Sequence, residues 1–114
     1  MQANLLQAAK DAANALDQKF GKDITVLDIS AVSTIADYFI ITEASNPNQV
    51  LAMTDGVEEA MAKHDLTLRH IEGMHRADWV LMDFGDIVVH IFNGESRTFY
   101  DLERTWRDAV AITV

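Results

Sequence analysis

Apolar and polar positions alternate most regularly between residues 78 and 92, where two apolar runs flank Gly85-Asp86. Glycine and aspartate between such runs are typical of a two-residue β-hairpin turn. We therefore predict an antiparallel hairpin in which Phe84 faces Ile87. The remainder of the fold is expected to be organised around this hairpin.

Successive side chains of a strand point to opposite faces, so this hairpin has one apolar face and one mixed face. The apolar face carries Val80, Met82, Phe84, Ile87, Val89 and Ile91. The mixed face carries Trp79, Leu81, Asp83, Val88, His90 and Phe92. On the mixed face, His90 lies opposite Leu81 and diagonal to both Asp83 and Trp79, within reach of long side chains. We expect the apolar face to pack in the core and the mixed face to carry the function.

Two stretches before the hairpin have the period of an amphipathic helix. In the first, residues 3–19, the apolar stripe consists of Leu5, Leu6, Ala9, Ala12, Ala13, Leu16 and, at its end, Phe20, and Gly21 suits a helix stop. The second runs from Pro47 to about His64 with a stripe of Val50, Met53, Val57, Ala60 and Met61. Asn46 is its predicted cap, and Gln49 occupies the capping-box position.

β-Branched and aromatic residues predict strands at 23–30, 37–42 and 67–71, and residues 96–107 again have helical spacing. The strand–helix–strand unit from 37 to 71 should form a right-handed parallel crossover. The sequence thus predicts one domain, residues 1–114, of the α/β (α+β) class, with a mixed sheet of about five strands and helices packed on it. The apolar tail after residue 107 is short and either frays or docks against a neighbour.

Composition and charge exclude several classes of function but say little about the fold. The chain of 114 residues is 49% hydrophobic, contains no cysteine and has a net charge of −9. These features exclude disulfides, thiol catalysis and thiolate zinc sites, and the absence of a secretory signal favours a cytoplasmic protein. Nucleic-acid binders neutralise phosphates with clustered basic residues, whereas the nine Lys and Arg residues are scattered here. A basic protein surface is therefore a better expected partner than RNA or DNA, although acidity that serves only solubility is at least as common.

Two motifs resemble metal sites without the context that such sites need. Residues 83–85 spell a kinase metal motif, but the chain is too short for a kinase and lacks a glycine-rich loop and a catalytic loop. His70, Glu72 and His75 have metal-ligating side chains, and alternation places the first two on one face. Their spacing is common by chance. We expect neither a resident metal ion nor another cofactor.

Acidic side chains raise two enzymatic alternatives. Asp83 and His90 could form the supporting half of a nucleophilic triad, but no hydroxyl is placed as the nucleophile, and a structural or binding pair is the commoner arrangement. Asp28, Asp83 and Asp86 could hold a divalent ion in a nucleotide-transfer site, but no phosphate-binding loop accompanies them. Trp79 is a stronger candidate, as a residue of a binding interface. Tryptophan is enriched at interface hot spots, and Trp79 lies on the mixed face beside Asp83 and His90.

A series of short motifs extends over nearly the whole chain. They are Asp37-Tyr-Phe-Ile-Ile, Glu72-Gly73 with Asp78-Trp79, Asp83-Phe-Gly-Asp86-Ile-Val-Val-His90-Ile-Phe, and Glu95-Ser-Arg97-Thr-Phe-Tyr100-Asp-Leu-Glu103 with Trp106. In these motifs the chain resembles the ribosomal silencing factor (Iojap-like) family. One departure is Glu43-Ala44, where the family usually has Thr-Gly.

The resemblance implies a translational repressor that is not an enzyme. Members of the family bind the large ribosomal subunit through large-subunit ribosomal protein fourteen and obstruct its joining with the small subunit when nutrients are scarce. Their fold is similar to that of nucleotidyltransferases, without the catalytic signature. The resemblance places the partner-binding surface at Trp79 and at matching positions, which are Asp78, Asp83, His90, Arg97, Tyr100 and Glu103.

Two other classes of function stay open from the residues alone. One is a small nucleotidyltransferase-related enzyme, which magnesium-dependent nucleotide binding would reveal. The other is an adaptor or oligomerisation module, which the acidic surface and the apolar tail allow. A homodimer is compatible with the silencing role as well, since a dimer could hide the partner surface.

Overall fold

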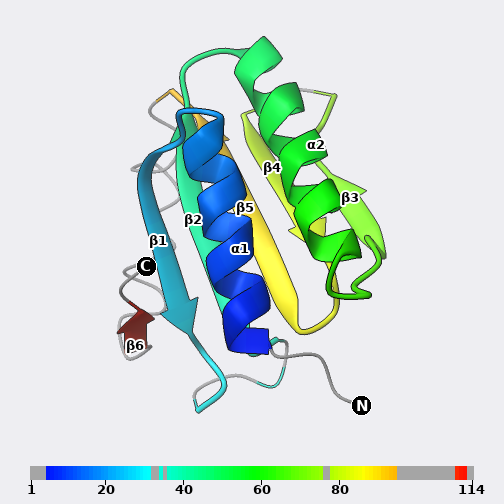
Figure 1. The fold of residues 1–114 in the computed structure, drawn as a ribbon. Coiled ribbons are helices and arrows are strands. Elements are labelled where there is room, and N and C mark those ends of the chain that lie inside the picture. The colour runs from blue at the N-terminus through cyan, green and yellow to red at the C-terminus, as the bar shows by residue number, and fades with distance from the viewer. Residues whose placement is uncertain (1–4, 32–33, 35, 76–77, 95–109, 113–114) are drawn as a thin grey trace.

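A mixed β-sheet with two helices on one face makes up most of the molecule. The computed structural model describes residues 5–31, 34, 36–75, 78–94 and 110–112. Its elements are α1 (Leu5–Gln18), β1 (Lys22–Asp28), β2 (Tyr38–Ala44), α2 (Pro47–Ala62), β3 (His70–Glu72), β4 (Trp79–Asp83), β5 (Ile87–Asn93) and β6 (Val110–Ile112). The helices lie side by side in front of the strands (Figure 1). The predicted α+β class is confirmed, and the tail contributes β6 as a sixth strand.

The strands follow the order β3-β4-β5-β2-β1-β6 across the sheet. β2 and β5 are parallel, and every other neighbouring pair is antiparallel. β3 is therefore parallel to β2, as the predicted crossover requires, but α2 carries the chain past β5 and β4 to the edge of the sheet. The crossover is right-handed (Figure 1). β3 begins at His70, so the prediction of a strand from residue 67 was wrong at its start.

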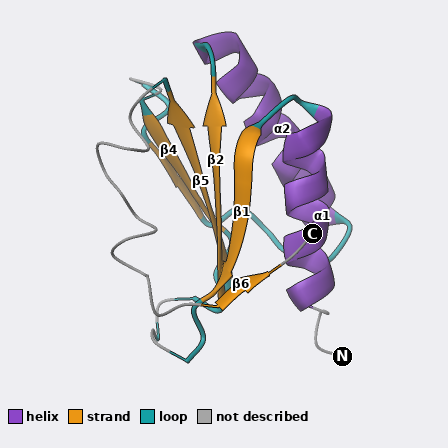
Figure 2. Cartoon of the chain, turned by 90° about the vertical axis from the view of Figure 1, so that its left-hand side faces the viewer, coloured by secondary structure: helices purple, strands orange, loops and turns teal. Residues whose placement is uncertain are grey.

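The apolar face of the hairpin packs under the two helices. All six of its predicted core side chains are at most 2% exposed, namely Val80, Met82, Phe84, Ile87, Val89 and Ile91. They form one cluster with the alanine-rich side of α1 and with the apolar stripe of α2. Figure 2 shows both helices on this one side of the sheet. We call it the helix-covered face. No described helix is long and apolar enough to cross a membrane.

The start of α2 follows its predicted capping in part. Asn46 Oδ1 accepts a hydrogen bond from Gln49 N at 2.8 Å, as an N-cap should. The Gln49 side chain does not complete a standard capping box, because its Oε1 accepts from Ser45 N at 2.6 Å. Its Nε2 donates to Lys19 O at 2.9 Å and to Phe20 O at 3.0 Å. Gln49 therefore ties the start of α2 to the end of α1.

The end of α1 differs from the predicted stripe. Phe20 was expected to continue the apolar side of the helix, but its side chain is 82% exposed. Its φ is 65°, in the left-handed region. Phe20 N donates to Asp17 O and Gly21 N donates to Leu16 O, each at 2.9 Å, which is the hydrogen-bond pattern of a Schellman helix end. The chain turns out of the helix one residue before the phenyl ring could reach the core.

A second link between the helices is a polar pair. His64 Nε2 lies 2.6 Å from Asp11 Oδ2. Hydrogen bonds from His64 and then Gln7 lower the pKa of the Asp11 carboxyl. The Asp11 side chain is 38% exposed, so solvent screening keeps the contribution to stability small. The predicted helix at 96–107 lies outside the described residues.

Candidate functional site

The β4–β5 hairpin has the predicted two-residue turn at Gly85-Asp86. Phe84 N donates to Ile87 O at 2.9 Å, which closes the turn between the two predicted neighbours. Asp83 Oδ1 accepts a hydrogen bond from Gly85 N at 2.7 Å. Gly85 has φ 93°, a conformation that side chains disfavour, so glycine is required there. The turn fixes the register of the strands that carry the candidate site.

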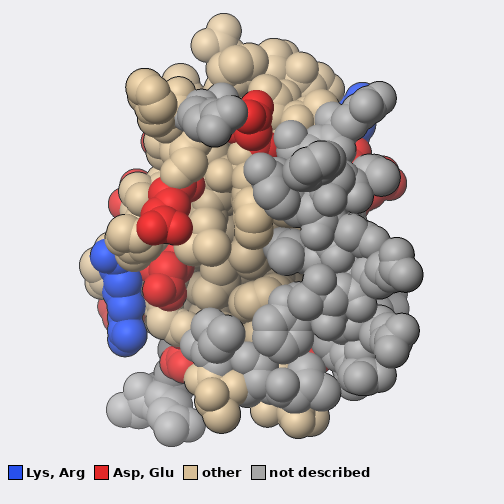
Figure 3. Space-filling view, turned by 180° about the vertical axis from the view of Figure 1, so that it is seen from behind, with Lys and Arg blue, Asp and Glu red and all other residues tan. Residues whose placement is uncertain are grey.

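The register brings the predicted mixed-face residues together on the side of the sheet away from the helices. Trp79 pairs with Phe92, Leu81 with His90, and Asp83 with Val88, as predicted. We call this side the second face. Its buried cluster consists of Leu27, Ile29, Ala36, Phe39, Ile41, Val88 and Phe92, with Trp79 and Leu81 packed partly buried against it. Acidic side chains are prominent on this side of the molecule (Figure 3).

Trp79 and His90 form the polar centre of the second face. Trp79 Nε1 donates to His90 Nδ1 at 3.1 Å. The indole also stacks on Phe92, with ring centroids 5.3 Å apart and an interplanar angle of 26°. The imidazole meets Phe39 edge-on at 4.7 Å. Both rings of the pair are thus held by aromatic neighbours from β2 and β5.

The hydrogen bond determines the protonation state of His90. An indole N–H can only donate, so Nδ1 must accept and the imidazole proton lies on Nε2. His90 is 3% exposed, and within the described part of the chain Nε2 has no hydrogen-bond partner. Burial lowers the pKa of His90 from 6.5 to about 4. The imidazole is therefore neutral near pH 7.

The acid predicted to pair with His90 is engaged elsewhere. Asp83 lies diagonal to His90 in the register, but its carboxylate holds Gly85 N in the turn, and the Trp79 indole takes His90 Nδ1. The predicted Asp83–His90 pair was therefore wrong. Trp79, the other diagonal neighbour named from the sequence, is the one that bonds His90. Side-chain alternation does not distinguish between the two neighbours.

The remaining predicted site residues fall into two groups. Asp78 is exposed at the start of β4, and its backbone oxygen accepts a hydrogen bond from Asn93 N at 2.9 Å. Arg97, Tyr100 and Glu103, together with Trp106, lie outside the described residues. The structure thus brings together Trp79 and His90, and Asp78 immediately precedes Trp79 in the chain.

The alternative metal and nucleotide sites are not assembled. His70 Nε2 and Glu72 Oε1 are 2.9 Å apart, but both side chains are mostly exposed. Asp28 Oδ1 instead accepts from Ser30 N and Ser30 Oγ, at 3.0 and 2.6 Å. Among the residues for which side chains are described, no three His, Asp or Glu side chains are grouped to hold a metal ion.

A groove of about 370 Å³ on the outer side of the two helices was not predicted from the sequence. Its lining mixes both charges, and it comprises Asp11, Asn14, Ala15, Gln18, Lys19, Gly56, Glu59, Ala60 and Lys63. The small residues of α1 and α2 that line it are visible in the sequence. Their meeting across two helices is not.

Comparison with known proteins decides the family. The family model described as "Ribosomal silencing factor during starvation" matches residues 2–114. The chain belongs to this family. The Bacillus subtilis protein named "Ribosomal silencing factor RsfS" is 39% identical over 100 residues, which cover 88% of this chain and 85% of that protein. The resemblance drawn from the hairpin motifs is therefore confirmed.

Two further relatives extend this result. A crystal structure of a Chromobacterium violaceum protein superposes with a TM-score of 0.85 at 31% identity and covers 94% of this chain and 88% of that one. The mouse protein named "Mitochondrial assembly of ribosomal large subunit protein 1" is 33% identical over 96 residues, or 80% of this chain and 41% of that protein. The names of the family, the Bacillus subtilis protein and the mouse protein all describe ribosome-associated roles, and none of the three denotes an enzyme.

Proposed function

We propose that this protein represses translation by binding the large ribosomal subunit through large-subunit ribosomal protein fourteen and obstructing its union with the small subunit. Family membership supports the ribosomal role. The single observation that supports the location is Trp79, a half-buried indole fixed between Phe92 and His90 on the sheet face opposite α1 and α2. The proposed activity is stoichiometric occlusion in the cytoplasm, without a catalytic step or a cofactor.

A fixed tryptophan suits an interface anchor for an energetic reason. Binding is weakened when flexible side chains must be ordered at the interface. The Trp79 ring is already oriented by one hydrogen bond and one stacking contact, so little further ordering is required. Tryptophan is also among the residues most enriched at hot spots.

Charge supports a basic protein as the partner of this surface. Asp78, the residue before Trp79, is exposed, and the net charge of the chain is −9. Opposite potentials steer encounter and fix the register of docking. Asp83 contributes to the surface by holding the hairpin turn as well as by its charge.

His90 contributes by positioning Trp79 in this proposal. Its side chain is 3% exposed, so direct contact with a partner would need a rearrangement of the sheet face. Its Nδ1 fixes the rotation of the indole instead. Arg97, Tyr100 and Glu103 belong to the proposed surface on the strength of the family resemblance.

Sedimentation through a sucrose gradient with separated ribosomal subunits tests the proposal. We expect wild-type protein to travel with the large subunit and to lower the yield of joined ribosomes, and Trp79→Ala to stay at the top of the gradient. Leu81→Ala is the matched control, because Leu81 is partly buried on the same face and lacks the hydrogen bond to His90. Circular dichroism establishes that both variants are folded.

Binding to purified ribosomal protein fourteen tests whether this protein, rather than another part of the large subunit, is the direct partner. Wild-type protein should bind it directly, and Trp79→Ala should reduce that affinity by at least tenfold, as loss of a hot-spot tryptophan does. If the wild-type protein does not bind the large subunit, the proposal is wrong. Binding to the subunit but not to ribosomal protein fourteen would reject the named partner.

A further inference from the structure

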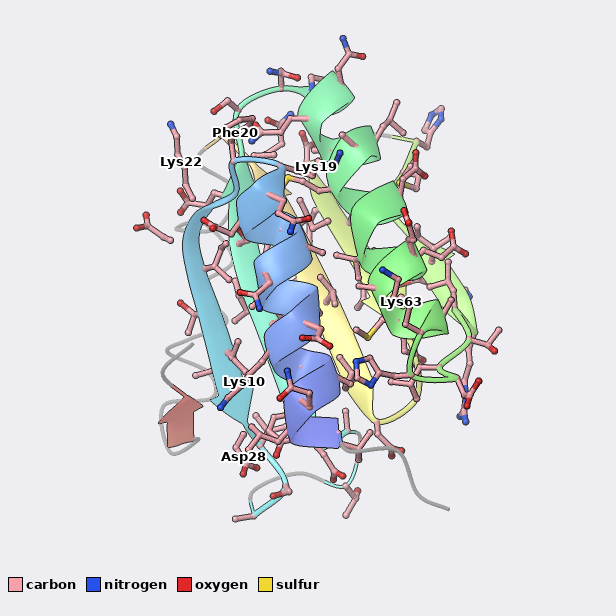
Figure 4. All side chains as sticks on the ribbon, in the orientation of Figure 1. Lys10, Lys19, Phe20, Lys22, Asp28 and Lys63 are labelled. Atoms are coloured by element: carbon pink, nitrogen blue, oxygen red, sulfur yellow. The ribbon has the colours of Figure 1, made fainter. Side chains whose placement is uncertain are left out.

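The turn from α1 into the first residue of β1, residues 19–22, has the sequence Lys-Phe-Gly-Lys and exposes an aromatic ring. Phe20 is 82% exposed, and Lys19 and Lys22 are exposed on either side of it. Neither lysine forms an ion pair with any residue in the described part of the chain. Figure 4 shows the three side chains at the same end of the molecule. The turn thus exposes a phenyl ring and two lysines, of which Lys19 also lines the groove on the helices, and the exposed carboxylates of Asp17 and Asp23 lie next to it in the chain.

Folding does not account for the phenyl ring at position 20. In a Schellman helix end this position adopts a left-handed conformation and is usually glycine, because other residues are strained there. Phe20 has φ 65° and buries little of its ring. The residue thus keeps an unfavourable conformation without compensating burial, which is the arrangement expected where a side chain is retained for binding.

The backbone that carries these side chains is held by hydrogen bonds from two neighbouring elements. Gln49 Nε2 donates to the backbone oxygens of Lys19 and Phe20, and the buried Thr42 hydroxyl donates to Lys22 O at 2.9 Å. Gly21 is required by space, since a Cβ there would lie 2.8 Å from Thr42 Oγ1. The turn therefore presents a ring and two ammonium groups from a fixed backbone.

We propose that this turn is a second docking surface, on which an unstacked base of large-subunit ribosomal RNA lies against Phe20 while Lys19 and Lys22 contact the flanking phosphates. The proposal rests on the proposed function, which brings the protein to the ribosome. Aromatic side chains flanked by cations are the usual platform for unpaired nucleotides. The ring stands clear of the groove between the helices, since Phe20 is not part of its lining.

The net charge explains why such a contact would be local and secondary. A chain of net charge −9 is repelled by phosphate over most of its surface. Two lysines allow contact with one or two phosphates only, so this turn adds affinity to an anchored protein and does not bind RNA alone. An acidic protein that receives the ring in a pocket is the competing partner, and cross-linking from position 20 distinguishes it from RNA.

Affinity for the large subunit, compared with affinity for isolated ribosomal protein fourteen, tests the second surface. Phe20→Gly should weaken subunit binding about tenfold, since stacking on one base is worth roughly 1–3 kcal/mol and 1.4 kcal/mol is a factor of ten. Phe20→Trp should retain binding, because it restores a stacking surface. Neither variant should change affinity for the isolated protein. The double substitution Lys19→Gln with Lys22→Gln should weaken subunit binding and reduce its salt dependence.

Cross-linking identifies what touches the ring. The protein with p-benzoylphenylalanine in place of Phe20, and otherwise wild type, is bound to the large subunit, irradiated and treated with ribonuclease. A cross-link to RNA is the expected result, whereas a cross-link to a ribosomal protein, or none, would overturn the inference. Wild-type affinity in Phe20→Gly would overturn it as well. The proposed function fails separately, through loss of wild-type binding or an unaffected Trp79→Ala variant.

Discussion

Neighbouring residues of β5 face two sides of the sheet that are equally buried and chemically different. Val89 and Ile91 are 0% exposed on the helix-covered face, where the buried Thr42, which pairs with Ile91, donates its hydroxyl to Lys22 O. His90, between them, is 3% exposed on the second face, and within the described residues only its Nδ1 has a hydrogen-bond partner. Burial alone therefore does not separate the stabilising face from the functional one. The difference lies in how fully the buried polar groups are paired, since Thr42 has its hydrogen bond whereas His90 Nε2 has none within the described residues, and the role of His90 that the structure supports best is the orientation of Trp79.

The largest effect should come from cavities on the helix-covered face. Ile91→Ala should lower the free energy of unfolding by about 2–5 kcal/mol, because it removes a fully buried side chain from a packed cluster. Leu81→Ala, on the second face, should have a clearly smaller effect, because Leu81 is only partly buried. Urea denaturation of both variants measures the difference. Equal losses would show that the two faces contribute alike to stability.

The second face should be sensitive to acid through His90. Its pKa is about 4 in the folded protein and 6.5 in the absence of burial, so between these pH values the unfolded chain binds a proton that the folded chain does not. Stability from this residue is complete above pH 6.5 and is lost as the pH falls towards 4. The total loss should be about 3 kcal/mol, from the difference between the two pKa values.

His90→Leu is the matched control for the acid effect. Replacing a buried imidazole that has one satisfied nitrogen with an apolar side chain should change the free energy of unfolding at pH 7 by about 1 kcal/mol or less. Between pH 7 and pH 5 the free energy of unfolding of the variant should rise by about 2 kcal/mol relative to that of the wild type. Denaturation curves at the two pH values decide the matter. A wild-type protein whose stability is flat from pH 7 to 5 would contradict the pKa assigned to His90.

The hydrogen bond within the second face should have a smaller effect of its own. Trp79→Phe keeps an aromatic ring against Phe92 and removes the donor to His90 Nδ1. We expect a loss of about 1–2 kcal/mol, because a buried acceptor is left unsatisfied. A double-mutant cycle with His90→Leu isolates this contribution, and a coupling energy near zero would mean that the two residues act independently.

The strand register and the division of side chains between the two faces were predictable from the sequence. The hydrogen bonds of individual polar side chains were not. Alternation and the Gly85-Asp86 turn were sufficient for the register that pairs Leu81 with His90. They did not determine which diagonal neighbour His90 would bond, and in the structure Trp79 donates to His90 Nδ1 while Asp83 accepts from Gly85 N. The passage of the β2–α2–β3 crossover over two strands was also not encoded in any local pattern.

Phe20 shows the same limit in a helix. Helical spacing placed it in the apolar stripe, but the terminal hydrogen bonds and the Gln49 clamp turn the chain before that position. A side chain that follows the period of a helix is buried only while the helix continues. The error in the prediction is what singles out Phe20, because an exposed aromatic residue in a left-handed conformation requires an explanation other than packing.

The smallest expected change in stability is also the one that tests this explanation. Phe20→Gly should raise the free energy of unfolding by up to about 1 kcal/mol, because glycine relieves the left-handed strain and little buried surface is lost. Lys19→Gly is the control, since Lys19 is not among the residues with positive φ and glycine should destabilise the chain there. Thermal and urea denaturation measure the expected gain in stability of Phe20→Gly and the expected loss in Lys19→Gly. If Phe20→Gly were destabilised as much as Lys19→Gly, the ring would contribute to folding, and retention for binding would no longer be needed to explain it.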